Sequence, residues 1–102
     1  MSRLFAVIRS QGPRWKVGQP LEAQRDWRNH AHFMDGLASR GFVVIGGPLE
    51  GTEDVLLIIR AAHEAEIRAR LVGDPWGEDM LKLGRIAPWT LRLGEQNLAT
   101  GA

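Results

Sequence analysis

The sequence contains no cysteine and no tyrosine, and its apolar runs are short. Without cysteine, a disulfide framework, a thiolate nucleophile and a cysteine-type zinc site are all excluded. The first apolar run, Leu4–Ile8, is too short for a signal-peptide core or for a membrane span. We therefore expect a cytoplasmic protein that does not insert into a membrane.

The chain also lacks an excess of either charge. It has 13 basic and 12 acidic residues, for a formal net charge of +1, and no two basic residues are adjacent. Nucleic-acid and anionic-membrane surfaces need clustered basic side chains, so neither partner is expected. Hydrophobic residues make up 44% of the 102 positions, which is enough for one modest core and one domain.

Hydrophobic patterning predicts alternating strands and helices. Strands are expected at Arg3–Arg9, Phe42–Leu49, Asp54–Arg60 and Lys82–Gly94, the last at an edge or with a bulge because of Pro88. Helices are expected from about Leu21 to Arg40, where Gly41 can end the first, and over Ala62–Val72. A long loop covers Gln11–Pro20, and we expect a domain over 1–94 and a flexible tail over 95–102.

The order strand–helix–strand–strand–helix–strand predicts an α+β fold of the ferredoxin-like type, with four antiparallel strands and both helices on one face. The strand segments "LFAVI" and "VLLII" are apolar at successive positions, so both of their faces need cover. Two helices cover only one face of such a sheet. A second copy of the chain is the simplest cover for the other, which predicts a back-to-back homodimer.

Two of the histidines, His30 and His32, lie two residues apart in the first predicted helix. On a helical wheel His30 falls within the apolar stripe of Trp27, Met34 and Leu37, whereas His32 points almost the opposite way. They cannot share a metal ion, and no metal site is predicted. His32 is expected at the surface, and His30 on a buried face, where a polar group must be hydrogen-bonded.

Three stretches together, "HAHFMDGLASRGFVVIGGPLEG", "VLLIIRAAHEAEIRARLVGDPW" and "IAPWTLRLG", resemble the YCII-related family. The resemblance covers about Arg3 to Gly94 and implies a dimeric α+β barrel. It also implies that the family's helix histidine falls on His30 and that its aspartate before a proline falls on Asp74. At least one relative is a dehydrochlorinase, and muconolactone isomerase shares the architecture, whereas most family members have no known reaction.

The resemblance implies a cofactor-independent lyase or isomerase acting on a small cyclic or aromatic substrate. Imidazole, with a reference pKa near 6.5, can act as acid or base at neutral pH, and a carboxylate on one ring nitrogen fixes its tautomer. The pair His30 and Asp74 is therefore the candidate catalytic pair, and Trp15, Arg14 and Trp76 are candidates for binding the substrate. An Asp-Pro step is also a common turn after a helix.

Two other interpretations stay open. In the first, His30 and Asp74 only satisfy each other inside a non-catalytic module that binds a small ligand or another protein. In the second, the helix histidine binds haem, as in some relatives of this barrel. The space at the free nitrogen of His30 separates them, because an enzyme needs an open pocket there and a haem site needs a much larger cavity.

Overall fold

The computed structural model describes residues 2–99. Its elements follow the predicted order: β1 (Arg3–Gln11), α1 (Trp27–Ser39), β2 (Val43–Pro48), β3 (Asp54–Ala61), α2 (Glu64–Leu71) and β4 (Leu81–Pro88). A short 3-10 helix, η1 (Leu21–Ala23), precedes α1, and α3 (Glu95–Ala99) follows β4. Among the described residues, no helix combines the length and the apolar character needed to cross a bilayer.

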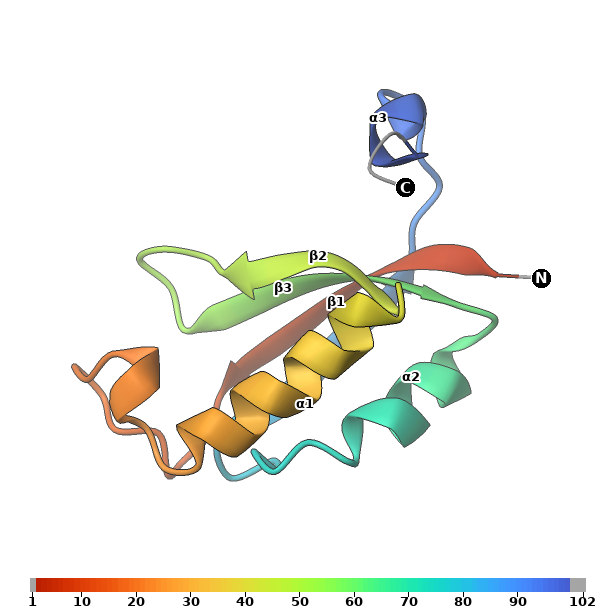
Figure 1. Cartoon of the computed structure of the whole chain (residues 1–102). Helices are drawn as coiled ribbons and strands as arrows, with labels where there is room; N and C mark the ends of the chain where they lie inside the picture. Colours follow the sequence, from red (N-terminus) through yellow and green to blue (C-terminus); the bar gives the residue numbers. More distant parts are fainter. Residues whose placement is uncertain (1, 100–102) are drawn as a thin grey trace.

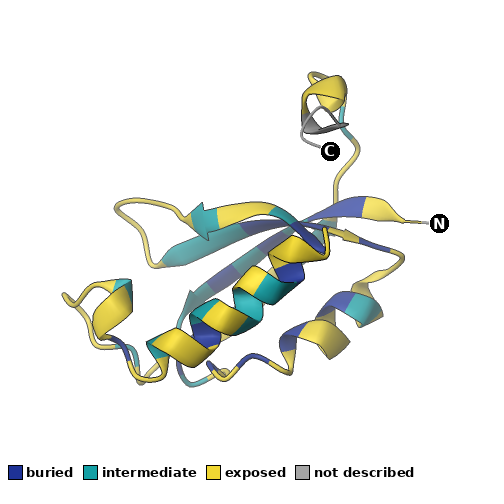
Figure 2. Ribbon diagram, viewed as in Figure 1, coloured by how far each residue is buried: buried dark blue, intermediate teal, exposed yellow. Residues whose placement is uncertain are grey.

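The four strands form one antiparallel sheet in the order β2-β3-β1-β4. Helices α1 and α2 lie on the same face of the sheet (Figure 1). The core lies between this face and the helices, where Val7, Ile59 and Ile67 are fully buried (Figure 2). The chain is therefore a small α+β domain with one covered sheet face, as the patterning predicted.

The first helix begins later than predicted. The segment Leu21–Ala23 forms η1, and α1 starts only at Trp27 after Asp26, whose φ of 60° breaks the helix. The cause is the buried side chain of Gln24, whose Oε1 accepts from Lys16 N at 2.9 Å while its Nε2 donates to Lys16 O at 3.0 Å. A glutamine amide that satisfies loop backbone groups in this way holds the chain out of the helix. The end of α1 is as predicted, because Gly41 takes a φ of 78°.

The last strand is shorter than predicted, because β4 ends at Pro88, on an edge of the sheet. Its pairing with β1 shifts between Ile8 and Arg9, which leaves Gly84 as the extra residue of a β-bulge. The predicted flexible tail is helical over Glu95–Ala99, whereas residues 100–102 lie outside the described part of the chain. The bulge matters for the site below, because it lies directly beside Arg9.

The histidine pair on α1 has the predicted orientation: His30 is buried and His32 is exposed.

Substitution of His32 by alanine should change the free energy of unfolding by no more than about 0.5 kcal/mol, as at other surface sites. Substitution of His30 by alanine should cost about 1–3 kcal/mol, since it removes the partner of a buried acceptor. Urea unfolding of the two variants at equal concentration measures both values, and similar costs would contradict the assigned helical phase.

Candidate functional site

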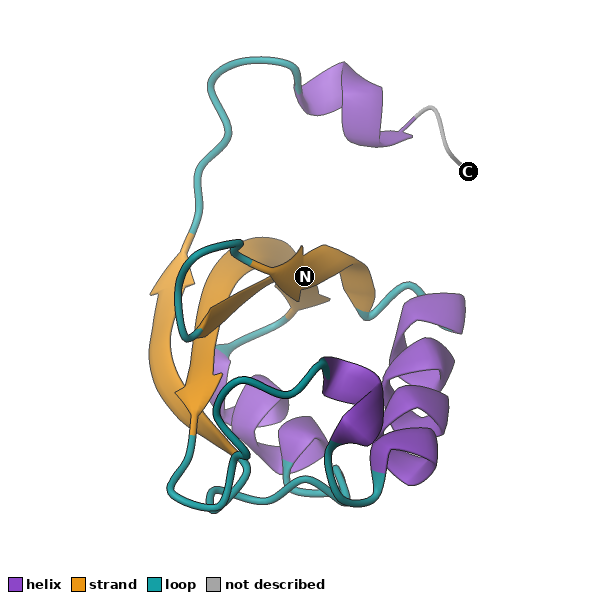
Figure 3. Ribbon diagram, turned by 90° about the vertical axis from the view of Figure 1, so that its left-hand side faces the viewer, coloured by secondary structure: helices purple, strands orange, loops and turns teal. Residues whose placement is uncertain are grey.

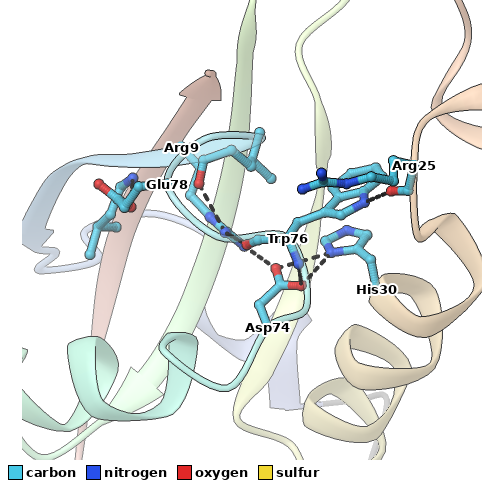
Figure 4. Close-up of polar contacts among 8 residues, drawn as sticks. Arg9, Arg25, His30, Asp74, Trp76 and Glu78 are labelled. Carbon is cyan, nitrogen blue, oxygen red and sulfur yellow. Dashed lines mark hydrogen bonds and ion pairs between the residues drawn. The ribbon is translucent and has the colours of Figure 1, made fainter. Parts of the chain in front are cut away.

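The structure brings His30 and Asp74 into direct contact. His30 lies on the first turn of α1, and Asp74 follows the end of α2, where its backbone N–H donates to Leu71 O at 3.1 Å. His30 Nδ1 is 2.8 Å from Asp74 Oδ1 and 3.0 Å from Oδ2 (Figure 4). An ionised carboxylate only accepts hydrogen bonds, so Nδ1 carries the proton in this pair. The two predicted catalytic residues therefore form a hydrogen-bonded pair.

Asp74 has two further partners. Arg9 Nη1 donates to its Oδ2 at 2.7 Å, and the Trp76 backbone N–H donates to Oδ1 at 2.9 Å. The side chain of Asp74 is 0% exposed and that of Arg9 is 4% exposed, so this is a buried ion pair. A buried carboxylate that accepts from an imidazole, a guanidinium and a backbone amide has a fixed position and a fixed charge.

Arg9 ties this cluster to the sheet and to the loop before β4. It projects from the central strand β1 toward the helices, and its Nη2 donates to Trp76 O at 3.2 Å and to Leu81 O at 3.0 Å. Its Nε is buried and bonds to none of the described residues. The β-bulge at Gly84 in β4 lies beside Arg9. Bulges are common next to functional sites, where they change the direction of a side chain.

The pKa of Asp74 reflects two opposing effects. Burial alone raises the pKa of this carboxyl, because the charged form loses its hydration. The hydrogen bonds from His30, Arg9 and the Trp76 backbone, together with the charge of His30 when it is protonated, outweigh burial and hold the pKa below its ordinary value. Asp74 is therefore an anion across the neutral range, which keeps the proton on His30 Nδ1.

Trp76 holds the imidazole from one side. The His30 and Trp76 rings are stacked, with centroids 3.8 Å apart and planes 11° apart. The indole is itself fixed, because its Nε1 donates to Arg25 O and the Trp15 ring meets it edge-on with centroids 5.2 Å apart. Trp27 packs against both stacked rings, with its centroid 6.0 Å from His30 and 5.9 Å from Trp76. The imidazole thus has a fixed plane as well as a fixed tautomer.

An apolar pocket of about 380 Å³ opens beside His30. It lies between α1 and the strands β2 and β3, and the loop before η1 closes one side of it. Most of its lining is apolar or aromatic and includes Trp15, Leu21, Trp27, Met34 and Trp76. Arg9, His30 and Asp35 are its charged or titratable members. A concave apolar site with a few polar groups is the usual form of a small-molecule site.

The free nitrogen of His30 reaches accessible space. Nδ1 is engaged by Asp74, and among the described residues Nε2 makes no hydrogen bond. The one fully buried side-chain nitrogen or oxygen without a partner in the described chain is Arg9 Nε, so His30 Nε2 is not sealed off. Because His30 also lines the pocket, its imidazole ring can be reached by a molecule bound there.

The other predicted binding residues divide into two groups. Trp15 and Trp76 both line the pocket, whereas Arg14 does not. The Arg14 side chain is exposed, and its Nε lies 3.8 Å from Asp79 Oδ2 at the surface. Sequence reasoning missed Arg9. For Trp27 it favoured packing over a place in the pocket wall, whereas the structure includes Trp27 in the lining. Arg9 did leave a signal, since it lies in phase with Phe5 and Val7 on a strand face that is otherwise apolar.

The described residues hold no group of three or more histidine, cysteine, aspartate or glutamate side chains arranged to bind a metal ion. Fold and site together define a small α+β protein with a histidine–aspartate–arginine cluster beside an apolar pocket. No protein-family model matches this chain, and no curated protein sequence matches it.

The lowered pKa of Asp74 predicts a specific dependence of stability on pH. Because this pKa is lower in the folded protein than in the unfolded chain, the carboxylate stabilises the fold at pH above about 4. That stabilisation is lost as the pH falls toward and through the folded-state value. Between about pH 5 and pH 2, the unfolding free energy should fall more steeply for the wild type than for Asp74→Asn. Urea unfolding at several pH values measures both slopes, and equal slopes would contradict the assignment.

Proposed function

We propose that this chain is a YCII-related protein of the ferredoxin-like, dimeric α+β barrel type, and that it is a cofactor-independent lyase or isomerase. Its substrate is a small cyclic or aromatic molecule, and His30 transfers a proton on that substrate. The observation that carries the proposal is the geometry of one imidazole: Nδ1 is held by Asp74 at 2.8 Å, and Nε2 is free where the ring lines the pocket.

In the proposed reaction, His30 Nε2 takes a proton from a carbon of the substrate, and the electron pair of that C–H bond moves into the adjacent unsaturated system. Return of the proton to a different carbon gives an isomer. Alternatively, the C–H electron pair forms a new C=C bond while the bond from the neighbouring carbon to a leaving group breaks, and the group departs with the electrons of that bond. This gives an elimination product, and His30 then loses its proton to water. Asp74 stabilises the imidazolium that forms and keeps the ring in place, as carboxylates do in other acid–base pairs.

The pocket supports a small, largely apolar ring as the substrate. A volume of about 380 Å³ lies near the lower end of the range for small-molecule sites. The indoles of Trp15 and Trp27 supply flat apolar walls, against which a ring can stack. The guanidinium of Arg9 is already committed to Asp74 and to two carbonyl groups, so it does not select for an anionic substrate.

A second candidate is a non-catalytic module that binds the same class of molecule. The observation in its favour is that Asp74 is fully engaged by its neighbours: the carboxylate accepts hydrogen bonds from three groups, and its partner imidazole is stacked on a fixed indole. Such a cluster also suits a purely structural role. The two candidates differ in one respect, because only the enzyme moves a proton to and from the ligand.

Exchange of substrate hydrogen for deuterium tests this difference. A panel of small cyclic enones, lactones and halogenated hydroxy-aromatics is incubated with the protein in D₂O, and NMR follows both binding and loss of C–H signals. If the protein is the proposed enzyme, we expect the wild type to catalyse hydrogen exchange or turnover of at least one compound. We expect the His30→Gln variant to catalyse neither. Binding in the pocket without exchange by any bound compound would favour the non-catalytic module.

The homodimer is part of the proposal. The face of the sheet opposite α1 and α2 carries Ala6, Ile8, Leu56 and Ile58, so apolar side chains point away from these two helices. Ile45 of the edge strand β2 extends this face and is 57% exposed. A two-fold contact between two such faces buries the same patch on both copies and is expected to exceed about 1,000 Å² in total.

Sedimentation velocity tests the homodimer. The wild type should sediment as a dimer at micromolar concentration, and Ile45→Glu should shift it toward monomer, because a charge is then buried in the interface. Val17→Glu is the matched control, since Val17 is also an exposed β-branched aliphatic residue but lies in the loop before η1. A folded wild-type monomer at this concentration would remove the dimer from the proposal.

A further inference from the structure

The pocket beside His30 runs along α1. Its lining extends from Leu21 in η1, which lies beside the first turn of α1, to Ala38 near the end of that helix (Figures 1 and 3). Among the described residues that line the pocket, Asp35 is the only acidic one. It follows His30 by five residues, which places it about 7–8 Å further along the helix axis. One helix therefore brings both an imidazole and a carboxylate to the pocket.

His30 and Asp35 lie at opposite borders of the stripe that α1 contributes to the lining. At about 100° per residue their directions differ by about 140°. The other α1 residues of the lining fall between them: Trp27, Ala31, Met34 and Ala38. The His30 border faces the central strand β1, from which Arg9 reaches Asp74. The Asp35 border therefore lies toward the edge strand β2, all of whose residues line the pocket.

The carboxylate of Asp35 lies at the open side of the pocket. Asp35 is exposed, whereas His30 is buried. Within residues 2–99, no hydrogen bond or ion pair engages the Asp35 side chain. At the buried end of the pocket, the charges of Arg9 and Asp74 compensate each other. With His30 neutral, the uncompensated charge that a bound molecule meets is therefore the negative charge of Asp35.

We propose that Asp35 selects the substrate: a ring that carries a hydrogen-bond donor, an ammonium or a hydroxyl group, on the side away from the reacting carbon, and no carboxylate there. An ionised carboxylate accepts hydrogen bonds and repels another anion, which gives Asp35 both preferences. A ring that packs against Trp27, with its reacting carbon at His30, has its far side toward Asp35. This inference rests on the proposed function and narrows its substrate class.

Binding of four matched probes tests the inference: benzylamine, benzyl alcohol, benzoate and toluene share one ring and differ in its substituent. The indole N–H signals in NMR spectra report binding, because Trp15, Trp27 and Trp76 line the pocket and Trp89 does not. We expect the wild type to bind benzylamine and benzyl alcohol more tightly than toluene, and benzoate most weakly. The tighter of the first two identifies the preferred donor as an ammonium or a hydroxyl group.

The Asp35→Asn variant should change the affinities for the two charged probes in opposite directions. It should weaken the binding of benzylamine and strengthen that of benzoate, each by about two- to fivefold, the usual effect of one exposed charge pair. The affinity for toluene should not change. Glu22→Gln is the matched control, because Glu22 is exposed on η1 and does not line the pocket, and its substitution removes the same charge.

Three results would overturn the inference while leaving the pocket as the proposed catalytic site. These are tighter binding of benzoate than of toluene, equal shifts of all four affinities in Asp35→Asn, and changes no larger than those in Glu22→Gln. A wild type that binds none of the four probes overturns the inference together with the pocket on which the proposed function rests. Failure of every bound compound to exchange hydrogen removes the enzyme alone, and the preference set by Asp35 then belongs to the non-catalytic module.

Discussion

Arg9→Met should lower the free energy of unfolding by about 3–5 kcal/mol, the cost of removing one member of a buried ion pair. Arg9 is 3% exposed, and its guanidinium donates at 2.7 Å to Asp74, whose side chain is fully buried. Methionine fills much of the same space but cannot donate, so it leaves Asp74 with an uncompensated charge. The carbonyl oxygens of Trp76 and Leu81 also lose their donor.

Urea unfolding at one fixed protein concentration measures this loss, because the stability of a dimer depends on concentration. Arg28→Met is the matched control: Arg28 lies exposed on α1, and its loss should stay within about 0.5 kcal/mol. The double variant Arg9→Met/Asp74→Asn should be destabilised by less than the sum of the two single variants, because the unpaired charge is gone. A loss for Arg9→Met as small as that of the control would refute the buried ion pair.

His30→Gln should lower kcat/KM by about 10²–10⁴-fold on any substrate that the wild type converts, the usual effect of losing a positioned acid–base group. Glutamine keeps an N–H that can donate to Asp74, but it has no nitrogen able to take a proton at neutral pH. Asp74→Asn should also lower kcat/KM, because an amide can hold the other imidazole tautomer and does not stabilise an imidazolium.

His32→Gln is the control for this experiment, because His32 lies on the exposed side of the same helix. Near-ultraviolet circular dichroism checks that the tryptophan cluster around the site is intact in each variant. Since Trp76 stacks on His30 at 3.8 Å, this signal reports directly on the site. A correctly folded His30→Gln protein with wild-type turnover would refute the role of His30 as acid or base.

The sequence by itself predicted the elements and their order, because periodicity is a local property of the chain. Short apolar runs and helical spacing indicated four strands and two helices, and Gly41 marked the end of the first helix, which the structure confirms. The last strand was expected to continue to Gly94 but ends at Pro88. The helical phase also separated His30 from His32, since a difference of two residues fixes opposite directions on any helix.

Only the tertiary structure decided how the site is composed. Asp74 lies 44 residues from His30 and 65 from Arg9, and their contacts depend on how α1, α2 and β1 meet across the core. No local pattern specifies such a distance. The same reason explains the late start of α1: the hydrogen bonds of Gln24 to the Lys16 backbone outweigh a helical pattern that continued back to Leu21. Patterning describes which faces are apolar, whereas pairing between distant polar groups is determined by packing.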